Sequence, residues 1–283
     1  GSDQIYLNGF STSLPEDVQI DSLRKIDGLE KVEFFRPGYA IEYDFFPPSQ
    51  LKNTLETKDV TGLYFAGQMN GTSGYEEAGA QGLICGINAS LSIKNNEPLV
   101  LTRDSSYIGV MIDDLITKDT LEPYRMFTSR AEHRLVLRCA NTPDRLLNKS
   151  AEFGLLKNPK VEFLTSVLEQ KKKLHTGLGK TITQEDIGEL ENIKHNMPAR
   201  ELLKRPKVFI KDLPDRFKTL DLSYPGWLAT ELLFDVESEI KYEGYINRAH
   251  AEIESMKEGD NIRLPKDTDY NSIPGLSNEA KEK

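Results

Sequence analysis

The chain has 283 residues, of which 38% are hydrophobic and 29% are charged, and its formal net charge is -9. This length allows one large domain or two ordinary ones with real cores, and the acidic balance argues against wholesale wrapping by nucleic acid. No apolar run approaches the ~20 residues that a membrane-spanning helix needs and no secretory signal is visible, so we expect a cytoplasmic protein without a membrane partner.

Residues 1–97 carry most of the strand signal, and residues 98–283 carry mostly helical signal. We predict a helix over Glu16–Ile26 behind Pro15. The polar connection Lys94–Pro98 is the predicted domain boundary. The predicted strands are Ile5–Leu7, Val32–Phe35, Tyr39–Tyr43 and Leu63–Ala66.

The stretch Leu63–Gly86 predicts a short strand, a glycine-punctuated loop and a helix that begins near Tyr75. The helix contains Gly79, Gly82 and Gly86, and each interior glycine costs roughly 1 kcal/mol relative to alanine. Without Cβ atoms, this stripe would let a second backbone or a flat cofactor approach closely. Ordinary packing of a helix on a sheet is the alternative interpretation.

The second part of the chain predicts a helix over Val161–Leu174, a loop over Gly177–Glu185, and one long helix over Val236–Met256 that is interrupted at Glu243. Cys85 and Cys139 lie in unrelated contexts and are predicted to be packed thiols. The histidines show no metal-ligand spacing, so we expect no metal site.

The acidic pairs Glu76-Glu77 and Asp113-Asp114 are adjacent in sequence, and adjacent residues on a helix point in different directions. We therefore expect Glu76 and Glu77 to stabilise a helix start, and the two aspartates to cap a helix or pair with arginines.

Positive charge is concentrated between Pro123 and Lys149, where six basic residues stand against two acidic ones, giving +4 locally. The spacing of Arg130, Arg134 and Arg138 would place three guanidinium groups along one edge of a helix, an arrangement that suits an RNA backbone. The alternative is a set of structural ion pairs. The predicted RNA-contacting residues are Arg125, Arg130, Arg134, Arg138 and Arg145.

Three blocks of sequence resemble one family. They are AGQMNGTSGYEEAGAQG at residues 66–82, STSLP at residues 11–15 with RPGYAIEYD at residues 36–44, and EPYRMFTSRAEHRL at residues 122–135. The first is similar to the second flavin segment of glutathione-reductase-type proteins, with Gly67-Gln68 in place of Gly-Asp. All three resemble the MnmG (GidA) family.

The resemblance implies an α+β chain in which the C-terminal portion of a glutathione-reductase-type FAD-binding α/β domain is followed by a mostly α-helical domain. It implies that the flavin would contact a single loop, which consists of Gly67, Gln68, Asn70, Gly71, Thr72, Gly74, Tyr75 and Glu76. Arg36, Tyr39 and Tyr43 are candidates for the substrate side, with core packing as the alternative for the tyrosines.

The family's function implies an enzyme that uses FAD, NADH and methylene-tetrahydrofolate to attach an aminomethyl-type group to C5 of the wobble uridine of tRNA. It also implies the MnmE GTPase as partner, and a homodimer. The chain starts without methionine and contains no GxGxxG fingerprint, so we expect a fragment that is inactive alone, with the catalytic residues upstream. The alternatives are a folate- and FAD-dependent tRNA uridine methyltransferase and a noncatalytic module that binds RNA or a partner.

Overall fold

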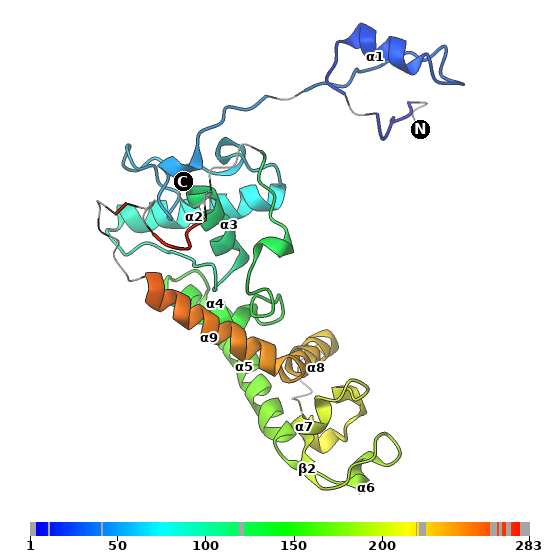
Figure 1. The fold of residues 1–283 in the computed structure, drawn as a ribbon, viewed down its shortest axis with the longest axis vertical. Coiled ribbons are helices and arrows are strands. Elements are labelled where there is room, and N and C mark those ends of the chain that lie inside the picture. The colour runs from blue at the N-terminus through cyan, green and yellow to red at the C-terminus, as the bar shows by residue number, and fades with distance from the viewer. Residues whose placement is uncertain are drawn as a thin grey trace.

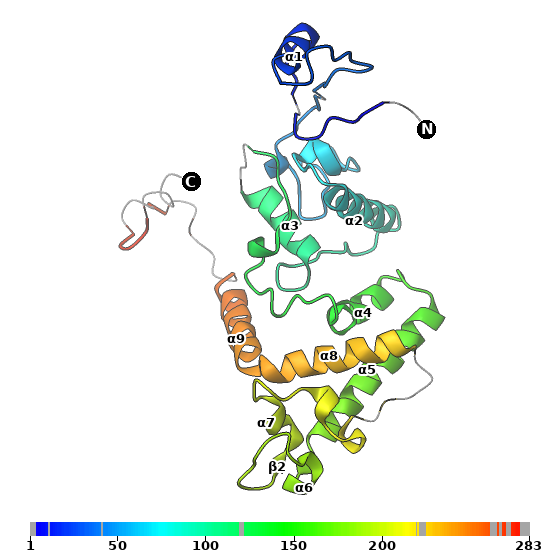
Figure 2. The ribbon, with the colours of Figure 1, turned by 90° about the vertical axis from the view of Figure 1, so that its right-hand side faces the viewer.

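The computed structural model describes residues 4–10, 12–40, 42–118, 122–218, 220, 225–260, 265, 268–269 and 273–277. The molecule is elongated and mostly helical, with α1 at one end and α6 and α7 at the other (Figures 1 and 2). Its α-helices are α1 (Glu16–Leu23), α2 (Tyr75–Ile93), α3 (Tyr107–Thr117), α4 (Thr142–Glu152), α5 (Asn158–Leu178), α6 (Gln184–Ile187), α7 (Ala199–Leu203), α8 (Gly226–Lys241) and α9 (Glu243–Asp260). The short 3-10 helices are η1 (Pro48–Gln50), η2 (Gly67–Asn70), η3 (Thr128–Arg130), η4 (Ile210–Asp212) and η5 (Asp215–Phe217).

The segment around α1 stands apart from the rest of the molecule and is joined to it by extended chain (Figure 1). The predicted helix behind Pro15 is confirmed. The buried side chain of Gln19 holds the segment together, since its amide nitrogen donates to the carbonyls of Leu14 and Gly38 and its oxygen accepts the Gly38 N–H. Little else in the segment is buried.

The predicted strands are wrong for the described residues. The described residues of Ile5–Leu7, Val32–Phe35 and Tyr39–Tyr43 are not strand, and Leu63–Ala66 keeps only a single antiparallel bridge from Tyr64 to Glu56. A strand needs a neighbour to complete its hydrogen-bond ladder. The described residues offer the first three segments no such neighbour.

The loop predicted over Gly177–Glu185 contains the end of α5, one strand of a short two-stranded sheet, and the start of α6. β1 (Thr181–Ile182) pairs antiparallel with β2 (Met197–Pro198). Between these strands, Thr183 and Asp186 form a reciprocal capping box that starts α6. The predicted loop over Gly177–Glu185 is therefore ordered by pairing with a distant segment.

The upper core lies mainly between α2 and α3. Buried apolar side chains on both sides of the predicted boundary belong to it, namely Leu51, Leu55, Phe65, Ile84, Cys85, Leu99, Met111, Ile112, Leu115 and Tyr124. The buried side chain of Asn88 on α2 crosses the same boundary, because it accepts the Leu99 N–H and donates to the Leu99 carbonyl. The boundary at 97/98 stays a prediction, but the residues that flank it pack together.

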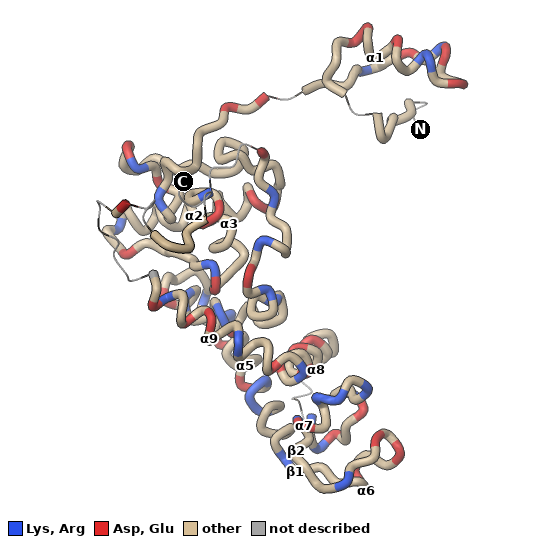
Figure 3. The backbone as a smooth tube through the Cα atoms, viewed as in Figure 1, with Lys and Arg blue, Asp and Glu red and all other residues tan. Residues whose placement is uncertain are grey.

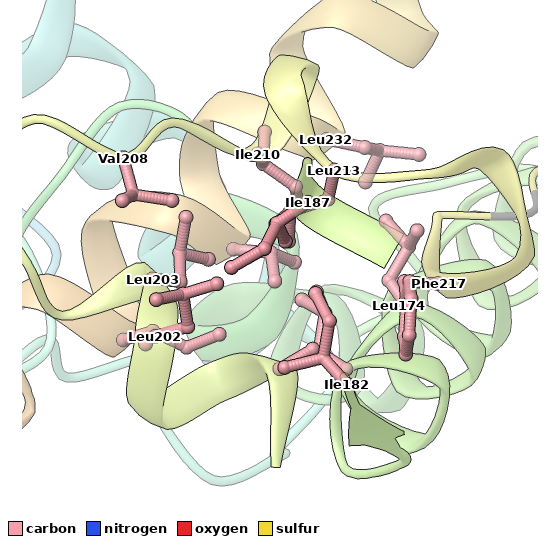
Figure 4. Close-up of a cluster of buried hydrophobic side chains, with 14 of the residues drawn as sticks. Leu174, Ile182, Ile187, Leu202, Leu203, Val208, Ile210, Leu213, Phe217 and Leu232 are labelled. Carbon is pink, nitrogen blue, oxygen red and sulfur yellow. The ribbon is translucent and has the colours of Figure 1, made fainter. Parts of the chain in front are cut away.

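The lower core gathers around α5, α7 and α8 (Figure 4). The predicted helix over Val161–Leu174 is confirmed as part of α5, whose Leu174 and Leu178 are almost fully buried. Chain that follows α7 wraps this core and contributes Val208, Ile210 and Phe217.

The stripe from Val236 to Met256 lies on two helices instead of one. The interruption predicted at Glu243 is confirmed, since α8 ends at Lys241 and α9 begins at Glu243 and turns away from α8 (Figure 2). The Glu243 carboxylate pairs with Arg200 and Lys204 near α7. These ion pairs fix the chain at the bend between the two helices.

A buried charge network joins α4, α5, α8 and the chain before α4. The Lys171 ammonium, 6% exposed, lies 2.6 Å from Asp235, 2.7 Å from Glu239 and 3.0 Å from Asp144. Arg138 pairs with Asp235 at 2.9 Å and with Glu239 at 3.0 Å.

Burial opposes the charged forms of this network, but the ion pairs outweigh it. Burial raises the pKa of the Glu239 carboxyl, yet hydrogen bonds from His175 and Lys171 bring the pKa down to about 2. Burial lowers the pKa of Lys171, and the three carboxylates more than reverse that effect. The charged forms are therefore the stable ones, and each depends on its partners.

Lys171→Met is expected to lower the free energy of unfolding by about 3 kcal/mol, because the buried Asp235 and Glu239 lose one of their cations and keep only Arg138 and His175 as positively charged or hydrogen-bonding partners. Urea unfolding measures the change. Lys172→Met, which changes an exposed neighbour on α5, is the control and is expected to shift the midpoint little. Equal effects of the two substitutions would contradict the role given to Lys171.

Candidate functional site

The predicted flavin loop runs from η2 to the start of α2. Gly67 and Gly71 have φ values of 78° and 75°, in the left-handed region that favours glycine. Gly74 is the N-cap residue of α2 and is extended. A Cβ atom at Gly74 would lie 1.7 Å from Glu77 Oε2, so any larger residue here would displace the Glu77 carboxylate.

Gln81, fully buried on α2, organises the loop from behind. Its oxygen accepts the Gly67 N–H at 3.0 Å and the Asn70 amide at 2.8 Å, and its nitrogen donates to Thr72 Oγ1 at 2.9 Å. The side chains of Asn70 and Thr72, predicted as cofactor contacts, therefore turn inward. Sequence reasoning missed Gln81. Its one signal is a polar residue on the same face of α2 as Ile84, Cys85 and Asn88.

The loop is joined to the segment that follows Glu122. Thr72 and Tyr124 form a parallel bridge, and the Tyr124 N–H donates to the Gly71 carbonyl at 2.8 Å. The buried Glu77 carboxylate accepts the Met126 N–H at 2.8 Å and lies 3.7 Å from Arg125. Burial raises the pKa of Glu77, but the backbone N–H of Met126 and the charge of Arg125 leave it below the usual range.

The opposite face of α2 is open. Tyr75 is 94% exposed, and Gln68 and Glu76 are also exposed. Cβ atoms added at Gly79, Gly82 and Gly86 would meet nothing within 4 Å. The chain itself therefore gives no packing reason for these three glycines.

Two buried acceptors at the loop lack a donor among the described residues: Asn70 Oδ1 and Glu77 Oε2. Leaving such an atom unpaired costs about 1–3 kcal/mol, so a donor from outside the described chain is expected. The N-cap residue Gly74 has no side chain that could accept a hydrogen bond from the first amides of α2. The N-terminal end of the helix dipole is positive and favours a negative charge at this point. These features fit a flavin, which carries an N–H and hydroxyl donors and becomes anionic on reduction.

The prediction that Arg130, Arg134 and Arg138 share one helix is wrong. η3 ends at Arg130, and residues 132–136 form turns. These turns are anchored internally, because the Val136 carbonyl accepts from Asn141 and the Arg138 guanidinium reaches α8. A continuous helix would not let both contacts form.

Four of the five predicted arginines fall into two pairs. Arg138 belongs to the buried charge network, and Arg145 donates to Asn141 and to the carbonyls of Ser105 and Arg138. Arg125 and Arg134 are exposed, and Arg134 forms no ion pair with a described residue. Contact with tRNA remains a prediction for all five, but internal partners already occupy Arg138 and Arg145.

Arg130 and Tyr124 tie the segment to a second ion cluster. The Arg130 guanidinium lies 4.4 Å from the Tyr124 ring centroid, and the Tyr124 hydroxyl donates to Asp114 at 3.0 Å. Arg103 pairs with Asp113, Asp114 and Glu132. The predicted pairing of the two aspartates with an arginine is thus confirmed, although the arginine is Arg103.

The remaining candidates are scattered. Arg36 lies 5.7 Å from the Tyr39 ring centroid, and Tyr39 and Tyr43 are exposed, so neither tyrosine packs into a core of the described chain. Their role toward a substrate stays a prediction. Cys85 is a buried thiol, as predicted, and burial raises its pKa to about 11. The prediction for Cys139 is wrong, since that thiol is exposed.

Within the described ranges, no histidine, cysteine and carboxylate side chains group in a way that could hold a metal ion. None of the helices in these ranges is both long enough and apolar enough to cross a membrane.

Two family models match the chain. Residues 1–97 match the model named Glucose inhibited division protein A, and residues 160–250 match that of the tRNA modifying enzyme MnmG/GidA C-terminal helical domain. These residues include the flavin loop and most of the lower core.

Relatives and solved structures agree with these models. The chain is 45% identical over 287 residues to the tRNA uridine 5-carboxymethylaminomethyl modification enzyme MnmG of Flavobacterium psychrophilum, a match that covers 99% of the chain and 46% of the relative. It is 47% identical over 292 residues to the MnmG of Syntrophotalea carbinolica, covering 100% of the chain and 46% of that relative. The structure of Aquifex aeolicus GidA in the form II crystal matches with a TM-score of 0.75 at 41% identity, over 100% of the chain and 46% of that protein.

The chain thus spans about half the length of the relatives it matches. Its architecture, in which the last part of a FAD-binding α/β domain leads into a helical domain, is that of the GidA structures, and this confirms the predicted fold class. The chain belongs to the MnmG/GidA family.

Gln81→Leu is expected to destabilise the chain by about 1–3 kcal/mol, because the Gly67 N–H loses its buried acceptor. Hydrogen exchange at the Gly67 amide is expected to accelerate, and thermal unfolding reports the stability. Gln68→Leu, at an exposed glutamine of the same loop, is the matched control. If the Gly67 amide exchanges at the same rate in both variants, Gln81 does not organise the loop.

Proposed function

We propose that this chain is the carboxy-proximal part of an FAD-dependent enzyme that adds a carboxymethylaminomethyl or aminomethyl group to C5 of the wobble uridine of tRNA. One observation carries the proposal: the backbone of the loop that resembles a flavin site pairs directly with the segment that bears Arg125. A cofactor surface and a phosphate-binding surface are thereby built as one unit. The names of the relatives favour this function over a uridine methyltransferase.

In this proposal the flavin is held at the start of α2. Gln68, exposed on the loop, contacts the ring, and the backbone from Gly71 to Glu76 forms the wall beside it. FAD supplies the redox chemistry when bound, with NADH and methylene-tetrahydrofolate as co-substrates. The chain's own contribution is the dipole of α2, which stabilises negative charge near Tyr75, and the buried Glu77, which fixes the loop against Met126.

The open stripe of α2 is the place where the rest of the longer protein and its cofactor approach. Its exposed residues Tyr75, Gly79, Gly82, Leu83, Gly86, Ser90 and Ile93 recur at helical spacing along one side. The three glycines leave the middle of this surface without side chains, which suits close packing of another backbone between the larger Tyr75, Leu83 and Ile93. The catalytic groups belong to that other part in this proposal, and the chain alone is inactive.

The RNA contacts of the proposal come from the turn-rich segment after Tyr124. Arg134 forms no ion pair with a described residue and can reach a phosphate, and Arg125 is exposed although it lies 3.7 Å from Glu77. Arg130 can reach a phosphate from its place over the Tyr124 ring. Arg138 and Arg145 hold this segment in place through contacts with Asp235 and with backbone carbonyls. The proposal also includes the MnmE GTPase as partner, a homodimer, and a cytoplasmic location alongside tRNA.

Gly82→Ala and Gly86→Ala test the flavin assignment through opposite effects. In the isolated chain each is expected to raise the free energy of unfolding by up to about 1 kcal/mol, since the added methyl group meets nothing and alanine favours a helix. In the full-length protein each is expected to lower FAD content, measured by absorbance after denaturation, because the stripe no longer admits its neighbour. Gly244→Ala on α9, also in open space, is the control and should leave FAD content unchanged. Wild-type FAD content in both α2 variants would sink the assignment.

Arg134→Glu in the full-length protein is expected to weaken tRNA binding and to reduce the slope of log affinity against log salt by about 1, as expected for a lost phosphate contact. Filter binding over a salt series measures both quantities. Lys94→Glu makes the same charge change at an exposed residue just after α2 and serves as control. If the two variants match, the Arg134 surface does not contact tRNA.

A further inference from the structure

Phe209 is an aromatic ring held outside the lower core. It is 43% exposed, although its neighbours Val208 and Ile210 are 0% and 4% exposed and belong to that core. Because both neighbours point inward, the backbone cannot rotate the ring into the core without removing them. The ring is therefore fixed at the surface between α7 and η4.

Two carboxylates hold this backbone. The Phe209 N–H donates to Asp212 Oδ2 at 3.1 Å, and the Ile210 N–H donates to Glu237 Oε2 of α8 at 2.8 Å. The ring is thus preorganised, and a ligand that stacks on it would lose little affinity to ordering the chain.

Ammonium groups surround the ring. Lys241 Nζ lies 4.3 Å from its centroid, and Lys211 Nζ lies 5.5 Å away. The segment from Lys204 to Lys218 contains six basic and two acidic residues, a balance of six minus two or +4, in a chain of net charge -9. Figure 3 shows basic residues gathered on the chain between α7 and α8.

Some of these charges have internal partners and some do not. Lys204 pairs with Glu201 and Glu243, Arg205 with Glu191, and Arg216 with Asp186. Lys207 is exposed and has no ion pair with a described residue. Lys211 contacts the Phe209 ring and likewise has no carboxylate partner in the described chain. These two ammoniums can take a phosphate without breaking an ion pair.

We propose that Phe209, with Lys207 and Lys211, binds an unpaired nucleotide of an RNA, while Lys241 stays paired with Glu237 beside the ring. The base stacks on the ring, and the ammonium groups contact the adjoining phosphates, which is how proteins hold single-stranded RNA. A single ring among lysines favours RNA over a protein partner, whose docking would need a broader apolar surface. The inference rests on the proposed function for the identity of the RNA, which is then an unpaired part of tRNA.

The test compares ring variants of the full-length protein by fluorescence anisotropy with labelled tRNA at fixed salt. Phe209→Ala is expected to bind about 5- to 150-fold more weakly, the range that loss of one base–aromatic stack produces. Phe209→Tyr keeps the ring and is expected to retain wild-type affinity. Lys207→Gln and Lys211→Gln are each expected to reduce the salt slope by about 1.

Phe163→Ala on α5 is the matched control. Phe163 is 39% exposed, and Lys160 Nζ lies 5.5 Å from its ring centroid. It resembles Phe209 in these respects, but it lies on α5, outside the basic segment from Lys204 to Lys218. Phe209→Tyr and thermal melting of each variant separate lost stacking from lost folding.

A single-stranded RNA oligonucleotide is the second probe. If the wild type binds tRNA, and Phe209→Ala and Phe163→Ala bind it with equal affinity, the inference is overturned while the proposed function stands. If the wild type binds the oligonucleotide through Phe209 but does not bind tRNA, the proposed function fails and the surface stands. Binding to neither probe, or loss of assembly with a protein partner while RNA binding is intact, overturns the inference.

Discussion

Three buried polar side chains on the inward face of α2 hold the candidate site together. Glu77, Gln81 and Asn88 lie on one side of the helix and bond, in turn, to the Met126 amide, to the flavin loop, and to Leu99. Each satisfies backbone groups that a buried loop would otherwise leave unpaired. Loops that are distant in sequence are therefore fixed to a single rigid element.

The two faces of α2 have opposite characters, and this contrast is the strongest structural sign of its role. The inward face is polar where it meets loops and apolar where it meets α3, and one of its buried oxygens, Glu77 Oε2, lacks a hydrogen-bond partner among the described residues. The outward face is open at Gly79, Gly82 and Gly86, where an added Cβ atom would meet nothing within 4 Å. The described chain gives these three interior glycines no packing reason.

Charge is used differently in the two parts of the molecule. Around Lys171, ions are buried and mutually satisfied, so they fix the arrangement of α4, α5 and α8 and offer nothing to a ligand. Around Arg125, Arg134 and Phe209, cations stay at the surface beside backbone that is held in place by hydrogen bonds. Net charge and local charge counts do not distinguish buried cations from surface cations. The carboxylate partners of each cation do.

The sequence by itself determined the features that depend on local rules and on family blocks. These are the helix that begins at Tyr75, the helix within α5, the bend at Glu243, and the glycine-punctuated loop before Tyr75, because glycine positions and apolar periodicity act over a few residues. The tertiary structure alone decided which side chains of that loop turn inward, since Gln81 captures Asn70 and Thr72. It also decided that Arg138 is an internal ion and that β1 pairs with β2, because both depend on contacts between residues far apart in the chain. Strand prediction failed before residue 44 for the same reason, since a strand forms only where another segment completes its hydrogen bonds.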